Sequence, residues 1–141
     1  MERISREDLF MTIALQMAKR STCLRAQVGC VIIDDNRRIL TSGYAGSPPG
    51  QPHCYEVGCD INELGACRRT IHAETNAIVY ATRIGISINH GIMFTTMSPC
   101  YKCAQLILSA GLKEIYYFEK YRDATGIEFL EKLGVICSLH G

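Results

Sequence analysis

The first part of the chain carries one helical and two extended patterns of apolar positions. Apolar residues recur at helical spacing after Ser5, which predicts a helix over roughly residues 6–20 with Ser5 as its N-cap. The apolar run 28–33 is short and rich in β-branched residues, as in a buried strand. Turn residues 34–36 separate it from a second strand over 39–44, which we expect to pair antiparallel with the first.

The second half of the chain alternates helices with strands. The pattern predicts helices over 71–84, 100–110 and 123–133, and strands over 92–96, 114–118 and 135–137. Gly85 and Gly111 mark the ends of the first two of these helices. This order favours a single domain over residues 1–141 of the three-layer α/β/α class, in which helices cover both faces of a five-stranded mixed sheet.

Residues 45–70 show neither pattern and contain many of the glycine, proline and cysteine residues. A loop this long in a compact domain is usually functional or is held by something. Three of the eight cysteines lie in it, so a metal ion is a candidate for holding the loop.

Composition narrows the class of protein. Hydrophobic residues make up 48% of the 141 residues and charged residues 21%, as in a folded domain with a real core. The net charge of +1 disfavours long nucleic acid as a partner. No apolar run approaches the roughly 18 to 20 residues of a membrane span, and the charged start lacks a signal-peptide pattern, so we expect a cytoplasmic protein. In a reducing cytosol, cysteines are better explained as metal ligands than as disulfides.

Two short motifs carry the chemistry: His72-Ala73-Glu74 and Pro99-Cys100-Tyr101-Lys102-Cys103. We expect each motif at the first turn of a helix. Cys100 and Cys103 then share one helix face, and the helix N-terminus favours their thiolate forms. With His72 they form three ligands and leave the fourth tetrahedral position of a zinc ion for water. Glu74 lies beside that position and can move protons.

Either motif alone is weak. A single Cys-x-x-Cys is often a structural zinc site or a redox pair, and His-x-Glu is common by chance. Together, in this order and on these elements, they match the signature of zinc deaminases.

Further motifs extend the match. They are Ser21–Arg25, Val28-Gly29, Gly43–Pro48, Pro52–Cys54 and Cys67–Glu74. Through them the chain resembles the deoxycytidylate (dCMP) deaminases of the cytidine deaminase superfamily over nearly its whole length. The Gly-Tyr turn and the His-Cys loop separate this group from deaminases of free nucleosides, guanine, tRNA adenosine and riboflavin precursors. The resemblance implies a cytidine deaminase-like fold and the zinc-dependent hydrolysis of dCMP to dUMP and ammonia, which would feed thymidylate synthesis.

The resemblance also implies roles for individual residues. His72, Cys100 and Cys103 would bind the catalytic zinc, and Glu74 would shuttle protons. Asn76, Ser98 and Tyr121 would lie near the bound nucleotide, although Tyr121 could equally be a surface aromatic.

A second zinc is a further implication, because some members of the family hold a structural zinc at positions matching Cys23 and Cys54. A four-thiolate site made of Cys23, Cys54, Cys59 and Cys67 would pin the long loop. The alternative is that these are free thiols, with His53 as a ligand or with no metal at all. Cys30 and Cys137 lie in apolar strands and are expected in the core.

Regulation is implied as well. Several dCMP deaminases are hexamers that dCTP activates and dTTP inhibits, with Mg²⁺ accompanying the triphosphate. Gly43, Tyr44, Ala45 and Gly46 match the effector region, where the family usually has asparagine in place of Ala45, so effector recognition can differ here. Arg25 is assigned to the same region. The guanidinium groups of Arg25, Arg68 and Arg69 could bind phosphate or could be solvated surface charges. Arg83 could belong to a subunit interface.

Two alternatives stay open. The chain could deaminate cytidine, a nucleic-acid base or another nucleotide. It could also be a non-catalytic, competence-type relative that uses the fold for binding. Glu74 beside an intact ligand set argues against the second alternative, because a purely structural site has no use for that acid.

Overall fold

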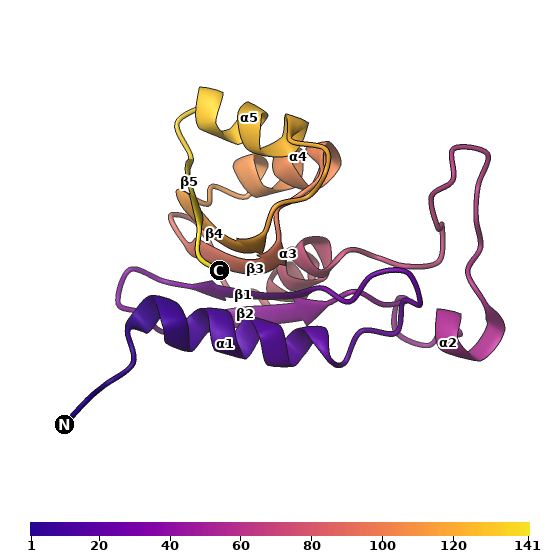
Figure 1. Ribbon diagram of the computed structural model, residues 1–141, viewed down its shortest axis with the longest axis horizontal. Coiled ribbons are helices and arrows are strands. Elements are labelled where there is room, and N and C mark those ends of the chain that lie inside the picture. The colour runs from indigo at the N-terminus through magenta and orange to yellow at the C-terminus, as the bar shows by residue number, and fades with distance from the viewer.

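The computed structural model describes all 141 residues and contains five helices and five strands (Figure 1). In chain order they are α1 (Arg6–Ala18), β1 (Gly29–Ile33), β2 (Ile39–Tyr44), α2 (Cys54–Val57), α3 (Ala73–Ile84), β3 (Ile92–Met97), α4 (Tyr101–Ser109), β4 (Glu114–Glu119), α5 (Thr125–Lys132) and β5 (Ile136–Leu139). No helix is long and apolar enough to span a bilayer.

The strands form one mixed sheet in the order β2-β1-β3-β4-β5. β1 pairs antiparallel with both β2 and β3, whereas β3, β4 and β5 run parallel to one another. The predicted five-stranded mixed sheet is confirmed, and so is the antiparallel pairing of its first two strands.

Alternation along the central strands creates two separate cores. Cys30, Ile32 and Met93 point to one face, where they meet α3, α4 and α5. The intervening Val31 and Phe94 point to the other face and meet α1. Successive strand residues face opposite ways, so two buried faces need helices on both sides. Figure 1 shows this arrangement, with α1 on one side of the sheet and the other long helices on the opposite side.

The long helices begin close to where the sequence patterns place them. Ser5 is the N-cap of α1, and its side chain accepts a hydrogen bond from the backbone N–H of Asp8. Gly85 ends α3 in the left-handed conformation. His72 and Cys100 are themselves the N-caps of α3 and α4, one position outside the helices, where the sequence pattern predicted them within the first turn.

Gly29 marks the closest approach of the sheet to α1. A Cβ atom there would lie 2.1 Å from the backbone oxygen of Ala14 and 2.4 Å from the backbone nitrogen of Ala18. Backbone cannot give way as a flexible side chain can, so only glycine allows this packing.

We therefore expect Gly29→Ala to lower the free energy of unfolding by about 3 kcal/mol, the upper part of the range for overpacked cores. Urea denaturation measures it. Gly134→Ala is the control, because Gly134 has a φ of 90° but open space around it, so only backbone strain of about 1 kcal/mol is expected. Equal losses in the two variants would contradict the packing argument.

The long loop contains short structure that its composition does not reveal. It holds the single-turn helix α2 and two isolated bridges, Gly46 with Ile71 and Ile61 with Cys67. Asn62 caps a turn at the tip, where its side-chain oxygen accepts from the backbone N–H groups of Leu64 and Ala66. In Figure 1 the loop extends away from the sheet beyond α2.

Candidate active site

Two helix N-termini bring the predicted ligands together. His72 precedes α3, and Cys100 precedes α4 after a short connection from the central strand β3. Cys103 lies in the first turn of α4 and is buried. α3 and α4 pack on the same face of the sheet, so residues 28 and 31 positions apart along the chain meet at one point.

The distances among these atoms fit a tetrahedral zinc site. His72 Nδ1 lies 3.7 Å from Cys100 Sγ and 3.4 Å from Cys103 Sγ, and all three donor atoms lie within 4.8 Å of one another. Standard zinc–nitrogen and zinc–sulfur bond lengths at tetrahedral angles predict a nitrogen–sulfur separation of about 3.6 Å. The residues present therefore fit a zinc ion bound by one imidazole and two thiolates.

The two thiols are prepared unequally for metal binding. Hydrogen bonds from Cys103 and His72 lower the pKa of Cys100 to about 4. The same thiol pair raises the pKa of Cys103, and burial adds to the effect, so Cys100 ionises first. The Cys100 thiolate in turn raises the pKa of His72 by accepting a hydrogen bond from its ring. A metal ion would displace the remaining protons and take both thiolates.

Glu74 is the acid of the site. It is 4% exposed, and burial raises its pKa above the ordinary value of a glutamic acid, whereas a hydrogen bond from Thr95 and the nearby His72 act in the opposite direction. The hydroxyl of Thr95 donates to Glu74 Oε1 at 2.8 Å. A buried carboxyl with a raised pKa is suited to both taking and returning a proton near neutral pH.

A cavity of about 450 Å³ opens over this site. His72, Glu74 and Cys100 line it. The other lining residues are Cys23, Arg25, Ala26, Val28, Ala45, Leu64, Gly65, Ala66, Cys67, Thr70, Ala73, Met97, Ser98, Tyr121 and Arg122. Its size suits a small-molecule ligand.

The predicted substrate residues lie differently with respect to the cavity. Ser98 and Tyr121 line it, and the buried hydroxyl of Ser98 accepts a hydrogen bond from the backbone N–H of Tyr121 at 2.6 Å. Asn76 does not line the cavity. Its side-chain amide instead donates hydrogen bonds to the backbone carbonyls of Tyr44 and Ile71. Asn76 thus ties the end of β2 to the start of α3, and its contact with nucleotide stays a prediction.

The predicted effector segment borders the same cavity. Arg25 and Ala45 line it, and the Arg25 guanidinium donates to the carbonyl of Gly65 at 2.8 Å. The backbone N–H and C=O of Ala45 are both used within the fold, bonded to Val28 and Thr22. Gly46 exchanges two backbone hydrogen bonds with Ile71, the residue before His72, which links this segment to the start of α3.

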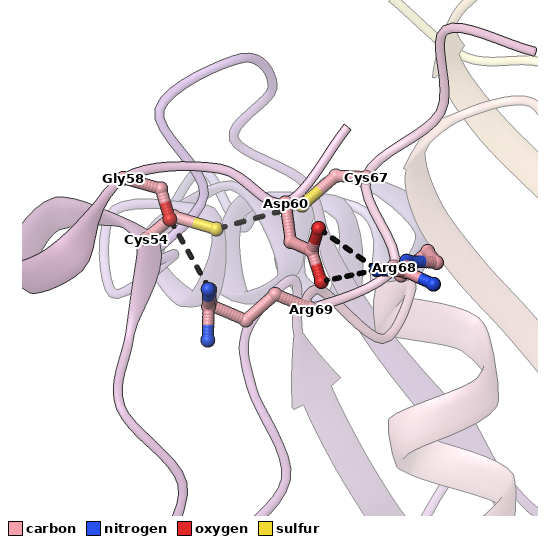
Figure 2. Close-up of polar contacts among 6 residues, drawn as sticks. All are labelled: Cys54, Gly58, Asp60, Cys67, Arg68 and Arg69. Carbon is pink, nitrogen blue, oxygen red and sulfur yellow. Dashed lines mark hydrogen bonds and ion pairs between the residues drawn. The ribbon is translucent and has the colours of Figure 1, made fainter. Parts of the chain in front are cut away.

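Three of the four cysteines predicted to form a second zinc site are clustered in the long loop. The sulfurs of Cys54, Cys59 and Cys67 lie within 4.8 Å of one another, and Cys23 is not part of this group. Figure 2 shows Cys54 and Cys67 pointing toward one another. Their sulfurs are 3.7 Å apart, well beyond the roughly 2.05 Å of a disulfide and close to the about 3.8 Å of two thiolates on one zinc ion.

The surroundings of this cluster favour a thiolate. Partial burial raises the pKa of Cys67, but the backbone N–H groups around it and the Cys54 thiol outweigh burial and lower the pKa to about 6. Arg68 forms an ion pair with Asp60, and Arg69 donates to the carbonyl of Gly58 (Figure 2). These two arginines therefore brace the loop, and neither lines the main cavity.

Two site residues escape the sequence motifs. Thr95 is one of two buried threonines in an otherwise apolar strand, and strand alternation places its side chain on the face that α3 covers. This polar position is only a weak signal. Arg122 lines the cavity directly after Tyr121, and nothing in its local pattern distinguishes it from a surface arginine.

Residues 4–119 match the family model of the cytidine and deoxycytidylate deaminase zinc-binding region. The chain belongs to this family of deaminases. The match includes the whole ligand set and Glu74.

Relatives within the family carry more than one name. ComE operon protein 2 of Bacillus subtilis is 40% identical over 136 residues, which are 96% of this chain and 71% of the relative. The deoxycytidylate deaminase of Schizosaccharomyces pombe is 35% identical over 94% of this chain, which spans 43% of that protein's length. The deoxycytidylate deaminase of Mycobacterium phage D29 is 34% identical over 83% of this chain and 97% of its own.

A solved relative has the same fold. The dCMP deaminase of cyanophage S-TIM5, in complex with dCMP and dUMP, superposes with a TM-score of 0.85 at 31% identity and covers 99% of this chain and 100% of its own. The cytidine deaminase-like fold is thereby confirmed.

Proposed function

We propose that this deaminase hydrolyses dCMP to dUMP and ammonia. The observation that carries the proposal is the three-donor set at zinc spacing with Glu74 beside it, at the floor of a cavity that two arginines also line. The dCMP and dUMP bound to the S-TIM5 enzyme support the choice of substrate.

Each residue has a separate task in the proposed reaction. Zinc held by His72, Cys100 and Cys103 would lower the pKa of a bound water to about 7, which supplies a nucleophile at neutral pH. Glu74 takes the two protons of the attacking water one after the other, and it gives the first to the ring nitrogen and the second to the departing amine. Water adds at the ring carbon that carries the amino group, the carbon–nitrogen bond breaks, and ammonia leaves.

Release of ammonia from a panel of substrates tests the proposal, with zinc measured on the same sample. The panel contains dCMP, dCTP, deoxycytidine, cytidine and single-stranded DNA. We expect turnover of dCMP to exceed all the others. Preference for a nucleoside or for DNA would overturn the substrate, and no turnover of any compound would favour a binding role.

The two arginines that line the cavity support the proposed preference for a nucleotide over a nucleoside, because a guanidinium can bind the phosphate group that only the nucleotide has. Arg25 already bonds to Gly65, whereas no hydrogen bond within the protein is found for the Arg122 guanidinium. A guanidinium contact with phosphate contributes about 1.5–3 kcal/mol.

We expect Arg122→Gln to raise KM for dCMP by about tenfold or more, because each 1.4 kcal/mol corresponds to a factor of ten. KM for deoxycytidine, which has no phosphate, should stay within about twofold. Arg38→Gln, at the exposed turn between β1 and β2, is the matched control and should change neither constant. A loss of kcat without a change in KM would contradict the assignment.

Regulation by dCTP and dTTP, with Mg²⁺ accompanying the triphosphate, extends the proposal. The hydrogen bonds between Gly46 and Ile71 support it, because they join the proposed effector segment to the residue before the ligand His72. Rates at low dCMP should rise with dCTP and fall with dTTP. Unchanged rates would overturn regulation and leave catalysis untouched.

Two structural proposals accompany the activity. The first is a structural zinc at Cys54, Cys59 and Cys67, with Cys23 as the fourth ligand after a local movement.

The second is a homo-hexamer, supported by exposed apolar residues Val79, Tyr80 and Ile84 on α3. Light scattering measures the oligomer, and a monomer at micromolar concentration would overturn the hexamer.

A non-catalytic binding role is the second candidate, and it stays open because the name of ComE operon protein 2, which is 40% identical, states no deaminase activity. The same ammonia assay decides between the two candidates.

A further inference from the structure

Thr95 contacts the catalytic acid from the centre of the sheet. It is fully buried in β3, and its hydroxyl oxygen lies 2.8 Å from Glu74 Oε1 and 3.0 Å from the carbonyl oxygen of Met97. Met97 lines the cavity, as Glu74 does. One hydroxyl therefore lies between the acid and the backbone of the cavity wall.

A threonine hydroxyl has one hydrogen and can also accept a hydrogen bond. The Thr95 hydroxyl donates to Glu74 Oε1, and the Met97 carbonyl oxygen lies within hydrogen-bonding distance of the same hydroxyl. No buried side-chain nitrogen or oxygen lacks a partner, so loss of this hydroxyl would remove one partner of the buried carboxyl group.

We propose that Thr95 is a positioning residue for Glu74, because its buried hydroxyl holds the carboxyl group toward the ligand set. The inference rests on the proposed function, because it takes Glu74 as the acid of that reaction. It explains why a polar side chain occupies a buried position on the strand face that otherwise carries Cys30, Ile32 and Met93 into an apolar core.

The test compares Thr95→Val, which keeps the shape but removes the hydroxyl, with Thr95→Ser, which keeps the hydroxyl. We expect Thr95→Val to lower kcat on dCMP about tenfold to a hundredfold, the equivalent of a hydrogen bond to a charged group. KM and zinc content should stay within about twofold of wild type. Thr95→Ser should recover kcat to within about threefold.

Thr96→Val is the matched control on the same strand. Thr96 is also buried, but its hydroxyl oxygen accepts from the backbone N–H of Gly29, away from the cavity. We expect this variant to lose stability in urea and to keep the wild-type kcat. An equal loss of kcat in Thr95→Val and Thr96→Val would show a general packing effect and overturn the proposal, as would full activity of Thr95→Val.

Crystal structures of the zinc-loaded Thr95 variants test the inference without any turnover. The carboxyl group of Glu74 should leave its position in Thr95→Val and keep it in Thr95→Ser. An unmoved carboxyl group in Thr95→Val overturns the proposal even if wild-type protein deaminates nothing. Inactive wild type with a displaced carboxyl group would instead reject the proposed function and retain the positioning role.

Discussion

Glu74→Gln should lower kcat on dCMP by at least about a hundredfold, the lower end of the usual contribution of a general acid or base. Glutamine has the shape of glutamate and can still bond to Thr95, but it cannot take a proton from water. Glu74 is buried at the floor of the cavity, so solvent cannot easily replace it. Steady-state assays of ammonia release measure the loss.

Zinc content and thermal stability separate loss of chemistry from loss of structure. The variant should keep its catalytic zinc, because His72, Cys100 and Cys103 are unchanged. Its stability should not fall, because the substitution removes an ionisable group whose charged form burial disfavours. Glu128→Gln, in the exposed first turn of α5, is the control for the same chemical change. A Glu74→Gln enzyme with near-normal turnover would refute the catalytic assignment.

The fold was largely predictable from the chain because its signals are local. The short buried runs of β1 and β3 and the end of α3 at Gly85 follow from neighbouring residues. α3 and α4 begin two and one residues later than the sequence pattern predicted, because His72 and Cys100 are N-caps with extended backbone. A pattern of apolar positions cannot distinguish an N-cap from the first helical residue.

The loop between β2 and α3 shows where prediction from pattern stops. α2 has a single turn, too short for a periodic signal, and the bridge between Ile61 and Cys67 depends on contacts across the loop. The turn at Asn62 is stabilised by its own side chain and needs no apolar pattern.

The residues of the site also differ in whether local sequence patterns reveal them. His72, Cys100 and Cys103 were predictable because they belong to two short motifs of fixed spacing, each at the start of a helix. The contact between Thr95 and Glu74 joins residues 21 positions apart on different layers, and only the packing of α3 on the sheet brings them together. Arg122 likewise becomes a candidate for phosphate only once the cavity is known.

Cys67→Ala should reduce bound zinc from two ions per chain to one and destabilise the protein. The Cys67 thiol has a lowered pKa, and its sulfur lies 3.7 Å from the sulfur of Cys54. It is therefore well suited to bind a metal ion as a thiolate within the loop. A ligand that binds only the folded state stabilises it by about 4 kcal/mol at a thousandfold excess over its Kd. We expect a loss of this size in the free energy of unfolding, together with faster proteolysis between residues 58 and 69.

The matched control is Cys137→Ala, because Cys137 lies in β5, outside both clusters. This variant should keep two zinc ions, and metal analysis of the purified proteins compares them. The proposed loop zinc would close a long segment that is otherwise held by isolated contacts such as a bridge, the Asn62 turn and one ion pair, so its removal should loosen residues 58–69. Leu64 and Gly65 of that segment line the active-site cavity, and their loosening should raise KM for dCMP even though the catalytic ligands are intact. One zinc per chain in wild-type protein, or unchanged zinc in Cys67→Ala, would contradict the second site and leave the catalytic one standing.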